Sequence, residues 1–193
     1  MVRRYGQVMQ SRYRAAALVP ALLLVAGVAA CSGSTGGVTA APTADSGLRP
    51  KGSTVTGTVE RVVDGDTVHV RVDGQDVTVR MIGINTPETV KPNSPIECFG
   101  PQASDFAKAA LTGQAVTLEF DDSQGMTDKY GRTLAYVWQG LPGGAQRLFN
   151  LDAVSGGFAY ERQYGATPYA WRTEFAAAQR AAKSQDAGLW GAC

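Results

Sequence analysis

Two Asp-Gly dipeptides, Asp64-Gly65 and Asp73-Gly74, constrain the fold more than any other feature of this 193-residue sequence. They separate three runs, 55–63, 66–72 and 75–84, in which β-branched and polar residues alternate. Such alternation is typical of half-buried strands, and Asp-Gly between alternating runs is the strongest short signal for a tight hairpin turn. The sequence therefore predicts a three-stranded antiparallel meander.

Two further strands and several helices are expected after the meander. A helix is predicted over 101–113, because Pro101 falls in its first turn and Gly113 near its end. Strands are predicted over 115–120 and 131–138. A short helix over 150–157 and a longer one, with apolar residues at helical spacing, complete the set: Trp171, Phe175, Ala178 and Ala182. Five strands with about three helices predict an α+β fold, a small closed barrel packed by helices.

The first thirty residues read as a targeting segment. Arginines precede the apolar stretch 15–30, and small residues lead directly to Cys31. This order is typical of a secretory signal, and a cysteine at that point resembles a bacterial lipobox, where it is lipidated. A plain signal peptide and an N-terminal anchor helix are the alternatives. We expect the protein to be exported. It is then either tethered by lipid to the outer face of the cytoplasmic membrane or also secreted.

Residues 31–53 are rich in Ser, Gly, Thr, Ala and Pro without periodicity, which predicts a flexible tether. The folded domain is expected over 54–193. The whole chain has a formal charge of +1, but the first thirty residues contribute four arginines and no acid. The remainder carries 14 Lys and Arg against 17 Asp and Glu, a net charge of −3. Purely electrostatic nucleic-acid binding is therefore excluded, and any phosphate chemistry needs a focused local site.

The meander brings oxygen-bearing side chains to one edge. Asp66 opens its second strand, and Asn85 and Thr86 close its third, so antiparallel pairing places these ends together, with Glu88 nearby. Carboxylate, amide and backbone oxygens suit a hard cation such as calcium. Arg80 lies in the same apolar strand and needs an anion, either a protein carboxylate or a substrate phosphate.

The turn before the 131–138 strand supplies a second polar group. Lys129 and Tyr130 lie in it, and Arg132 leads into the strand, where it could form a second fork for phosphate oxygens. The sequence has one histidine, His69, in mid-strand, which is more often a surface or cross-strand residue. A general base must then be a carboxylate, and Glu88 is next to the expected metal.

Four blocks in order, "DGDTV", "VRMIGINTPE", "FGPQAS" and "DKYGRTLAYVW", resemble the staphylococcal nuclease (thermonuclease) family over about residues 54–190. The resemblance implies a five-stranded OB-type barrel and calcium-dependent phosphodiester cleavage of DNA and RNA that leaves 3′-phosphate ends. It implies metal binding by Asp66 and the Thr86 carbonyl, water activation by Glu88, phosphate binding by Arg80 and Arg132, and contact with a neighbouring phosphate by Lys129 and Tyr130.

Asn85 departs from the family pattern, which usually has aspartate before Thr-Pro-Glu. Its amide oxygen can still coordinate calcium, but one negative charge is missing, so weaker calcium binding is expected. Asp64 could partly restore that charge. Family tyrosines are expected to hold single-stranded substrate by stacking. Gln163 falls at one expected tyrosine position, so among Tyr160, Tyr164 and Tyr169 we favour Tyr164, while packing of these rings against the last helix is the alternative.

Cys98 and Cys193 are expected to form a disulfide, because an exported domain lies in an oxidising compartment. Two free thiols are the alternative. The preferred interpretation is a monomeric, membrane-tethered nuclease acting on DNA or RNA, preferably single-stranded. A nucleic-acid-binding barrel whose catalysis has decayed is the main alternative, and a protein-interaction module is the weaker one. Arg80, Glu88 and Arg132 together favour the enzyme, since a pure binder has no use for a carboxylate beside phosphate.

Overall fold

The structure is a computed structural model that describes residues 47–89 and 95–193. All of these belong to one compact unit. The expected signal segment, the lipidation site Cys31 and most of the expected tether lie outside the described residues. Within the described ranges, no helix is both long enough and apolar enough to cross a membrane.

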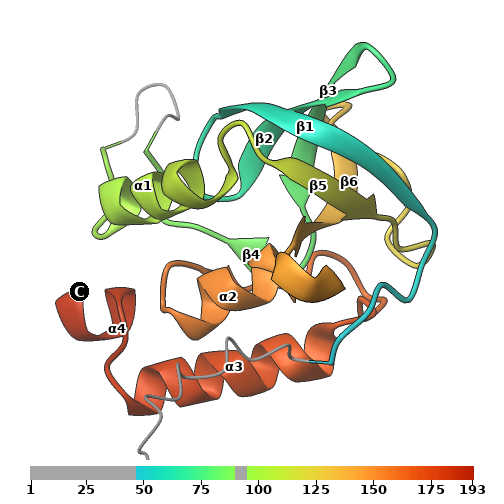
Figure 1. Cartoon of the computed structure of the whole chain (residues 1–193). Helices are drawn as coiled ribbons and strands as arrows, with labels where there is room; N and C mark the ends of the chain where they lie inside the picture. The colour runs from blue at the N-terminus through green and yellow to red at the C-terminus, as the bar shows by residue number, and fades with distance from the viewer. Residues whose placement is uncertain (1–46, 90–94) are drawn as a thin grey trace, which may run out of the picture. The chain divides into compact units, whose positions relative to one another are not determined.

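Five strands close into a barrel, as the sequence predicts (Figure 1). They are β1 (Thr54–Val62), β2 (Thr67–Val72), β3 (Gln75–Met81), β5 (Ala115–Glu119) and β6 (Thr133–Gly140). Their order is β3-β2-β1-β5-β6, and a parallel pairing of β3 with β6 closes the sheet. The meander is antiparallel throughout, so the first residue of β2 lies opposite the end of β3.

The third strand is shorter than predicted. It ends at Met81, and β4 (Ile84–Asn85) instead pairs with β8 (Tyr160–Glu161), a strand that the sequence did not predict. Gly83 separates the two with a φ of 78°, which favours glycine, and a Cβ there would lie 2.6 Å from the ring of Tyr169. A further unpredicted strand, β7 (Gln146–Leu148), extends the sheet beside β6.

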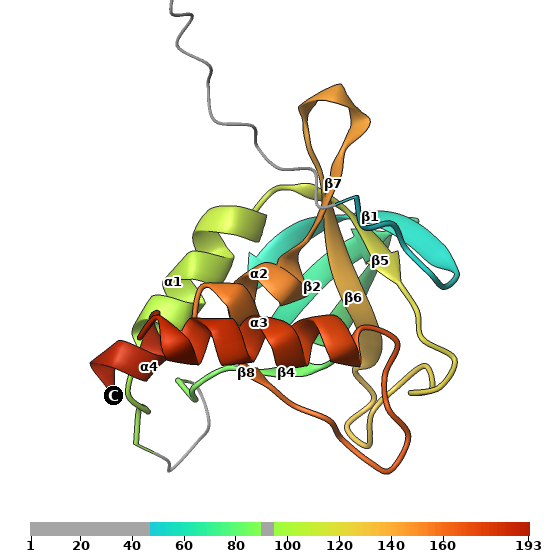
Figure 2. The same ribbon diagram turned by 90° about the horizontal axis from the view of Figure 1, so that it is seen from below.

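Helices cover the barrel on one side. The predicted ones are α1 (Gly100–Leu111), α2 (Phe149–Ser155) and α3 (Arg172–Ser184), and short turns η1 (Pro142–Gly144) and α4 (Leu189–Ala192) were not predicted. Helix α2 lies between the barrel and α3 (Figures 1 and 2). The apolar stripe on and before α3 is turned inward as its spacing indicates, with Trp171, Phe175 and Ala182 buried and Ala178 half-buried.

A buried carboxylate joins the barrel to α3 and to the chain entering β1. The side chain of Glu119 accepts hydrogen bonds from the indole nitrogens of Trp138 (2.7 Å) and Trp171 (3.1 Å). Its other oxygen accepts the backbone N–H groups of Lys51 (2.6 Å) and Gly52 (3.0 Å). Four donors satisfy a carboxylate that would otherwise be costly to bury. Contacts with the folded domain therefore already begin at Lys51 and Gly52, before the first strand.

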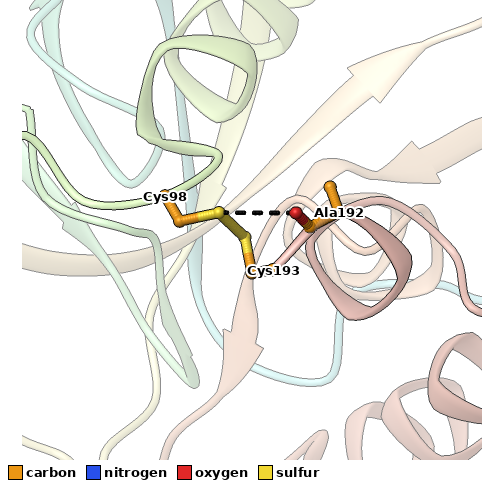
Figure 3. The surroundings of a disulfide bond; sticks show 3 residues. All are labelled: Cys98, Ala192 and Cys193. Carbon is orange, nitrogen blue, oxygen red and sulfur yellow. Dashed lines mark hydrogen bonds between the residues drawn. A yellow bond between two sulfur atoms is a disulfide. The ribbon is translucent and has the colours of Figure 1, made fainter.

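The expected disulfide is present between Cys98 and Cys193, with the sulfurs 2.10 Å apart. Figure 3 shows it beside the carbonyl of Ala192, whose oxygen lies 3.8 Å from the sulfur of Cys98. The bridge closes a sequence separation of 95 residues. It thereby ties the last residue of the chain to the segment that enters α1.

Replacing Cys98 and Cys193 together by serine is expected to lower the free energy of unfolding by about 2–4 kcal/mol, because the cross-link restricts the unfolded chain over a long loop. Urea unfolding of the full chain measures the change. Reductant should destabilise the parent by a similar amount and leave the double variant unaffected. Equal unfolding midpoints for oxidised parent and variant would contradict this role.

Candidate active site

A cavity of about 780 Å³ opens where the end of the meander, the turn before β6 and the segment after β8 come together. It is lined by all of the residues that were expected to bind metal, phosphate or base: Asp66, Arg80, Asn85, Thr86, Glu88, Lys129, Tyr130, Arg132 and Tyr164. Asp66 and Arg132 therefore share one cavity although they lie far apart in the sequence, because β3 pairs with both β2 and β6.

Arg80 has a carboxylate partner at the floor of this cavity. Its Nη2 forms an ion pair with Oδ2 of Asp66 at 3.1 Å, and both side chains are at least nine-tenths buried. Its Nη1 donates to the carbonyl of Met81 at 2.8 Å. The same Asp66 oxygen accepts the backbone N–H of Thr86 at 2.9 Å and its hydroxyl at 3.2 Å. The ends of the meander therefore meet as the turn geometry predicts.

A second carboxylate lies beside Asp66. Burial and the charge of Asp66 raise the pKa of Asp64 to about 6. Its Oδ1 accepts the backbone N–H of Asp66 at 3.0 Å. Nowhere in residues 47–89 and 95–193 do three or more His, Cys, Asp or Glu side chains gather in a way that could hold a metal ion. The set at this edge instead combines two carboxylates with amide and backbone oxygens, and these hard donors fit calcium chemistry.

Asn85 directs its side-chain oxygen toward the arginine and a tyrosine. Its Oδ1 accepts the hydroxyl of Tyr164 at 2.8 Å and Nη2 of Arg80 at 3.3 Å. The Tyr164 hydroxyl in turn accepts from Arg80 Nη2 at 3.1 Å. The residue at the position of the usual aspartate thus takes part in a polar network around the buried guanidinium.

The second arginine is held by its own turn. Asp128 accepts the backbone N–H groups of Tyr130 (2.9 Å) and Arg132 (3.0 Å) through Oδ1, while Oδ2 accepts the Arg132 Nε at 2.7 Å and pairs with its Nη2 at 2.6 Å. Partial burial alone would raise the pKa of Asp128, but the hydrogen bonds and charge of Arg132 outweigh it and lower that pKa. Asp128 thereby fixes the side chain of Arg132 at the cavity mouth.

Two cations without carboxylate partners lie over exposed tyrosine rings. Lys129 Nζ is 5.0 Å from the ring centre of Tyr130, and Arg162 Cζ is 5.7 Å from that of Tyr164. Among the described residues, neither cation makes an ion pair. Arg162 lines the cavity but was missed in the sequence, because nothing distinguishes it there from other exposed arginines.

The other candidate tyrosines are structural. Tyr169 is 3% exposed, and its hydroxyl donates to Glu161 at 2.9 Å. Burial and this bond raise the pKa of Tyr169. Tyr160 packs edge-on against Trp190 at 5.2 Å. Tyr160 and Tyr169 therefore pack against the helices, as the alternative interpretation of these rings states. Among the three tyrosines, only Tyr164 is both exposed and part of the cavity lining.

Glu88 lies in the loop that follows β4, half-buried at the cavity wall. Its Oε1 accepts the backbone N–H of Thr89 at 2.9 Å, and its own N–H donates to Glu97 at 3.0 Å. His69 lies away from this cavity, opposite Arg61 on β1, where its ring contacts Arg61 and Asp76. The carboxylate, and not the histidine, is thus the candidate base within the cavity.

Replacing Asp128 by Asn removes the ion pair with Arg132 but keeps an oxygen that can accept the backbone N–H groups. The pKa of Asp128 in the folded protein lies below its ordinary value of about 3.9. The ionised carboxylate therefore stabilises the folded protein fully above about pH 4, and this stabilisation is lost as the pH falls through the folded pKa. The parent should be the more stable protein near pH 7, and the difference should shrink below about pH 4. Urea unfolding against pH measures it, with exposed Asp122→Asn as control. A difference independent of pH would contradict the assignment.

Comparison with known proteins identifies the family of this chain. Residues 78–192 match the family model described as staphylococcal nuclease homologue. A thermonuclease of Staphylococcus intermedius is 44% identical over 132 residues, which cover 68% of this chain and 74% of that protein. A thermonuclease of Staphylococcus hyicus is 43% identical over 132 residues, covering 68% and 73%. Endonuclease YncB of Bacillus subtilis is 35% identical over 133 residues, covering 69% and 60%. This chain therefore belongs to the staphylococcal nuclease family.

Proposed function

We propose that this chain, a nuclease of the staphylococcal type by its family, cleaves phosphodiester bonds of DNA or RNA with the help of calcium. The observation that carries the proposal is the gathering of Arg80, Glu88 and Arg132 around one cavity, beside the carboxylates Asp64 and Asp66. Two guanidinium groups match phosphate oxygens, and a carboxylate next to them can accept a proton from water.

Each residue has one task in the proposed reaction. Arg80 and Arg132 bind the scissile phosphate and stabilise the charge that grows on its oxygens, which is commonly the largest catalytic contribution. Glu88 takes a proton from the attacking water. The water oxygen then bonds to phosphorus, the bond to the 5′ oxygen breaks, and that oxygen takes up a proton from solvent, which leaves a 3′-phosphate and a 5′-hydroxyl. Calcium, held by Asp66 and the Thr86 carbonyl with Asn85 beside them, would supply positive charge beside the phosphate.

Single-stranded substrate suits the exposed aromatic residues of the cavity. Tyr130 is 72% exposed and Tyr164 is 52% exposed, each with a cation near its ring. Rings and cations arranged in this way bind bases by stacking and the backbone by charge, largely independent of sequence. Lys129 would contact a phosphate next to the scissile one. The lipobox-like sequence that ends at Cys31 supports tethering outside the cytoplasmic membrane through a lipid on that cysteine, and we expect the domain to act as a monomer.

Replacing Glu88 by Gln should slow cleavage of single-stranded DNA by about 10²- to 10⁴-fold, the usual contribution of a general base. The full chain is assayed with calcium and with chelator, and only the parent with calcium should degrade DNA rapidly. Glu60→Gln is the matched control, because Glu60 pairs with Arg71 on the barrel surface. Binding of DNA by the parent without cleavage would instead favour a binding module.

Replacing Asn85 by Asp should tighten calcium binding, by about tenfold if the restored charge faces the cation, because ligand charge sets affinity at oxygen sites. Calorimetric titration of the full chain with calcium measures the dissociation constant. Gln102→Glu on the exposed face of α1 adds the same charge at a distance and should change it little. Identical calcium affinity in parent and Asn85→Asp would show that residue 85 does not act on the bound ion.

A further inference from the structure

Tyr164 contacts the site through its hydroxyl as well as its ring. The pairing of β4 with β8 sets Asn85 opposite Tyr160, and the chain that continues from β8 contributes Arg162 and Tyr164 to the cavity lining. The ring of Tyr164 remains half-exposed, yet its hydroxyl donates to Asn85 Oδ1 at 2.8 Å. The same hydroxyl accepts from Arg80 Nη2 at 3.1 Å. Tyr164 is therefore a bridge between the amide and the guanidinium.

The Tyr164 hydroxyl determines which end of the Asn85 side-chain amide faces Arg80. The two ends of an Asn side chain have similar shapes but opposite roles, since Oδ1 accepts hydrogen bonds and Nδ2 donates them. Arg80 has only donors, so an Nδ2 turned toward it would leave donor facing donor. The Tyr164 hydroxyl donates one hydrogen bond to Asn85 Oδ1 and accepts one from Arg80. This pair of bonds forms only when the amide oxygen of Asn85 faces Arg80 and Tyr164.

We propose that Tyr164 is a positioning residue that holds the Asn85 amide with its oxygen toward Arg80 and so fixes the guanidinium for phosphate. This inference rests on the proposed function, in which Arg80 binds the scissile phosphate. In this proposal the hydroxyl of Tyr164, and not only its ring, contributes to catalysis by positioning Asn85 and Arg80. Asn85, which departs from the family pattern, and Tyr164 thus act together.

An aspartate at position 85 would not need this bridge. Both carboxylate oxygens accept hydrogen bonds, and the negative charge attracts Arg80 in either rotamer. Loss of the Tyr164 hydroxyl should therefore lower kcat when residue 85 is Asn and change kcat little when residue 85 is Asp. Base stacking makes a different prediction, because Phe keeps the ring and should preserve stacking in both backgrounds.

Four full-length proteins test the proposal: the parent, Tyr164→Phe, Asn85→Asp and the double variant. Cleavage of single-stranded DNA with calcium gives kcat and KM separately. With Asn85, Tyr164→Phe should lower kcat by about three- to tenfold, the range that one lost hydrogen bond corresponds to, with a smaller change in KM. With Asp at 85, the same change should alter kcat by less than about twofold. Tyr160→Phe is the matched control, because the Tyr160 ring packs against Trp190 and is not part of the cavity lining.

A second measurement needs neither calcium nor cleavage. The side-chain amide resonances of Asn85 in a ¹H–¹⁵N spectrum are identified by their loss in Asn85→Asp. Tyr164→Phe should shift and broaden them, because the amide then samples both orientations, while Tyr160→Phe should leave them unchanged. Amide resonances that Tyr164→Phe does not move would overturn the inference.

The outcomes separate this inference from the proposed function. A parent that cleaves, with equal effects of Tyr164→Phe in both backgrounds or no effect in either, overturns the inference and leaves the nuclease in place. A parent that fails to cleave with calcium overturns the proposed function, and with it the catalytic role of Tyr164. In that case the amide resonances still decide whether Tyr164 orients Asn85.

Discussion

The buried ion pair between Asp66 and Arg80 is the interaction on which the rest of the site depends. It joins the start of β2 to the end of β3, and the same carboxylate oxygen holds the backbone of Thr86. The chain is thereby fixed where it leaves the barrel toward Glu88. Removing either charge would leave the other buried without its partner, which is strongly destabilising. The pair also leaves Arg80 at the cavity with its position set in advance, so that little reorganisation is needed when phosphate binds.

The two arginines are held in different ways. Arg80 is almost fully buried among Asp66, Asn85 and Tyr164, whereas Arg132 lies at the mouth and is fixed by the turn residue Asp128. Each guanidinium has its own carboxylate, which reduces the repulsion between the two cations of one cavity. This local balance explains how a folded region with an excess of acidic residues can still offer a phosphate site.

Much of the site could be predicted because its spacing depends on local rules. The Asp-Gly turns determine the meander, and antiparallel pairing then brings Asp66 to the end of the third strand. The separate strand β4 could not be foreseen, since it pairs with residues far along the chain and depends on Gly83 next to the Tyr169 ring. The contact between Asn85 and Tyr164 depends on that same pairing. Side-chain partners across such distances follow from the packed fold and leave no periodic signal in the sequence.

The most direct test of the account is a crystal structure of the full chain with Glu88→Gln, calcium and a short single-stranded DNA bound. The account predicts one phosphate between the guanidinium groups of Arg80 and Arg132, with calcium against Asp66. A phosphate bound elsewhere, with the arginines engaged only by Asp66 and Asp128, would contradict it.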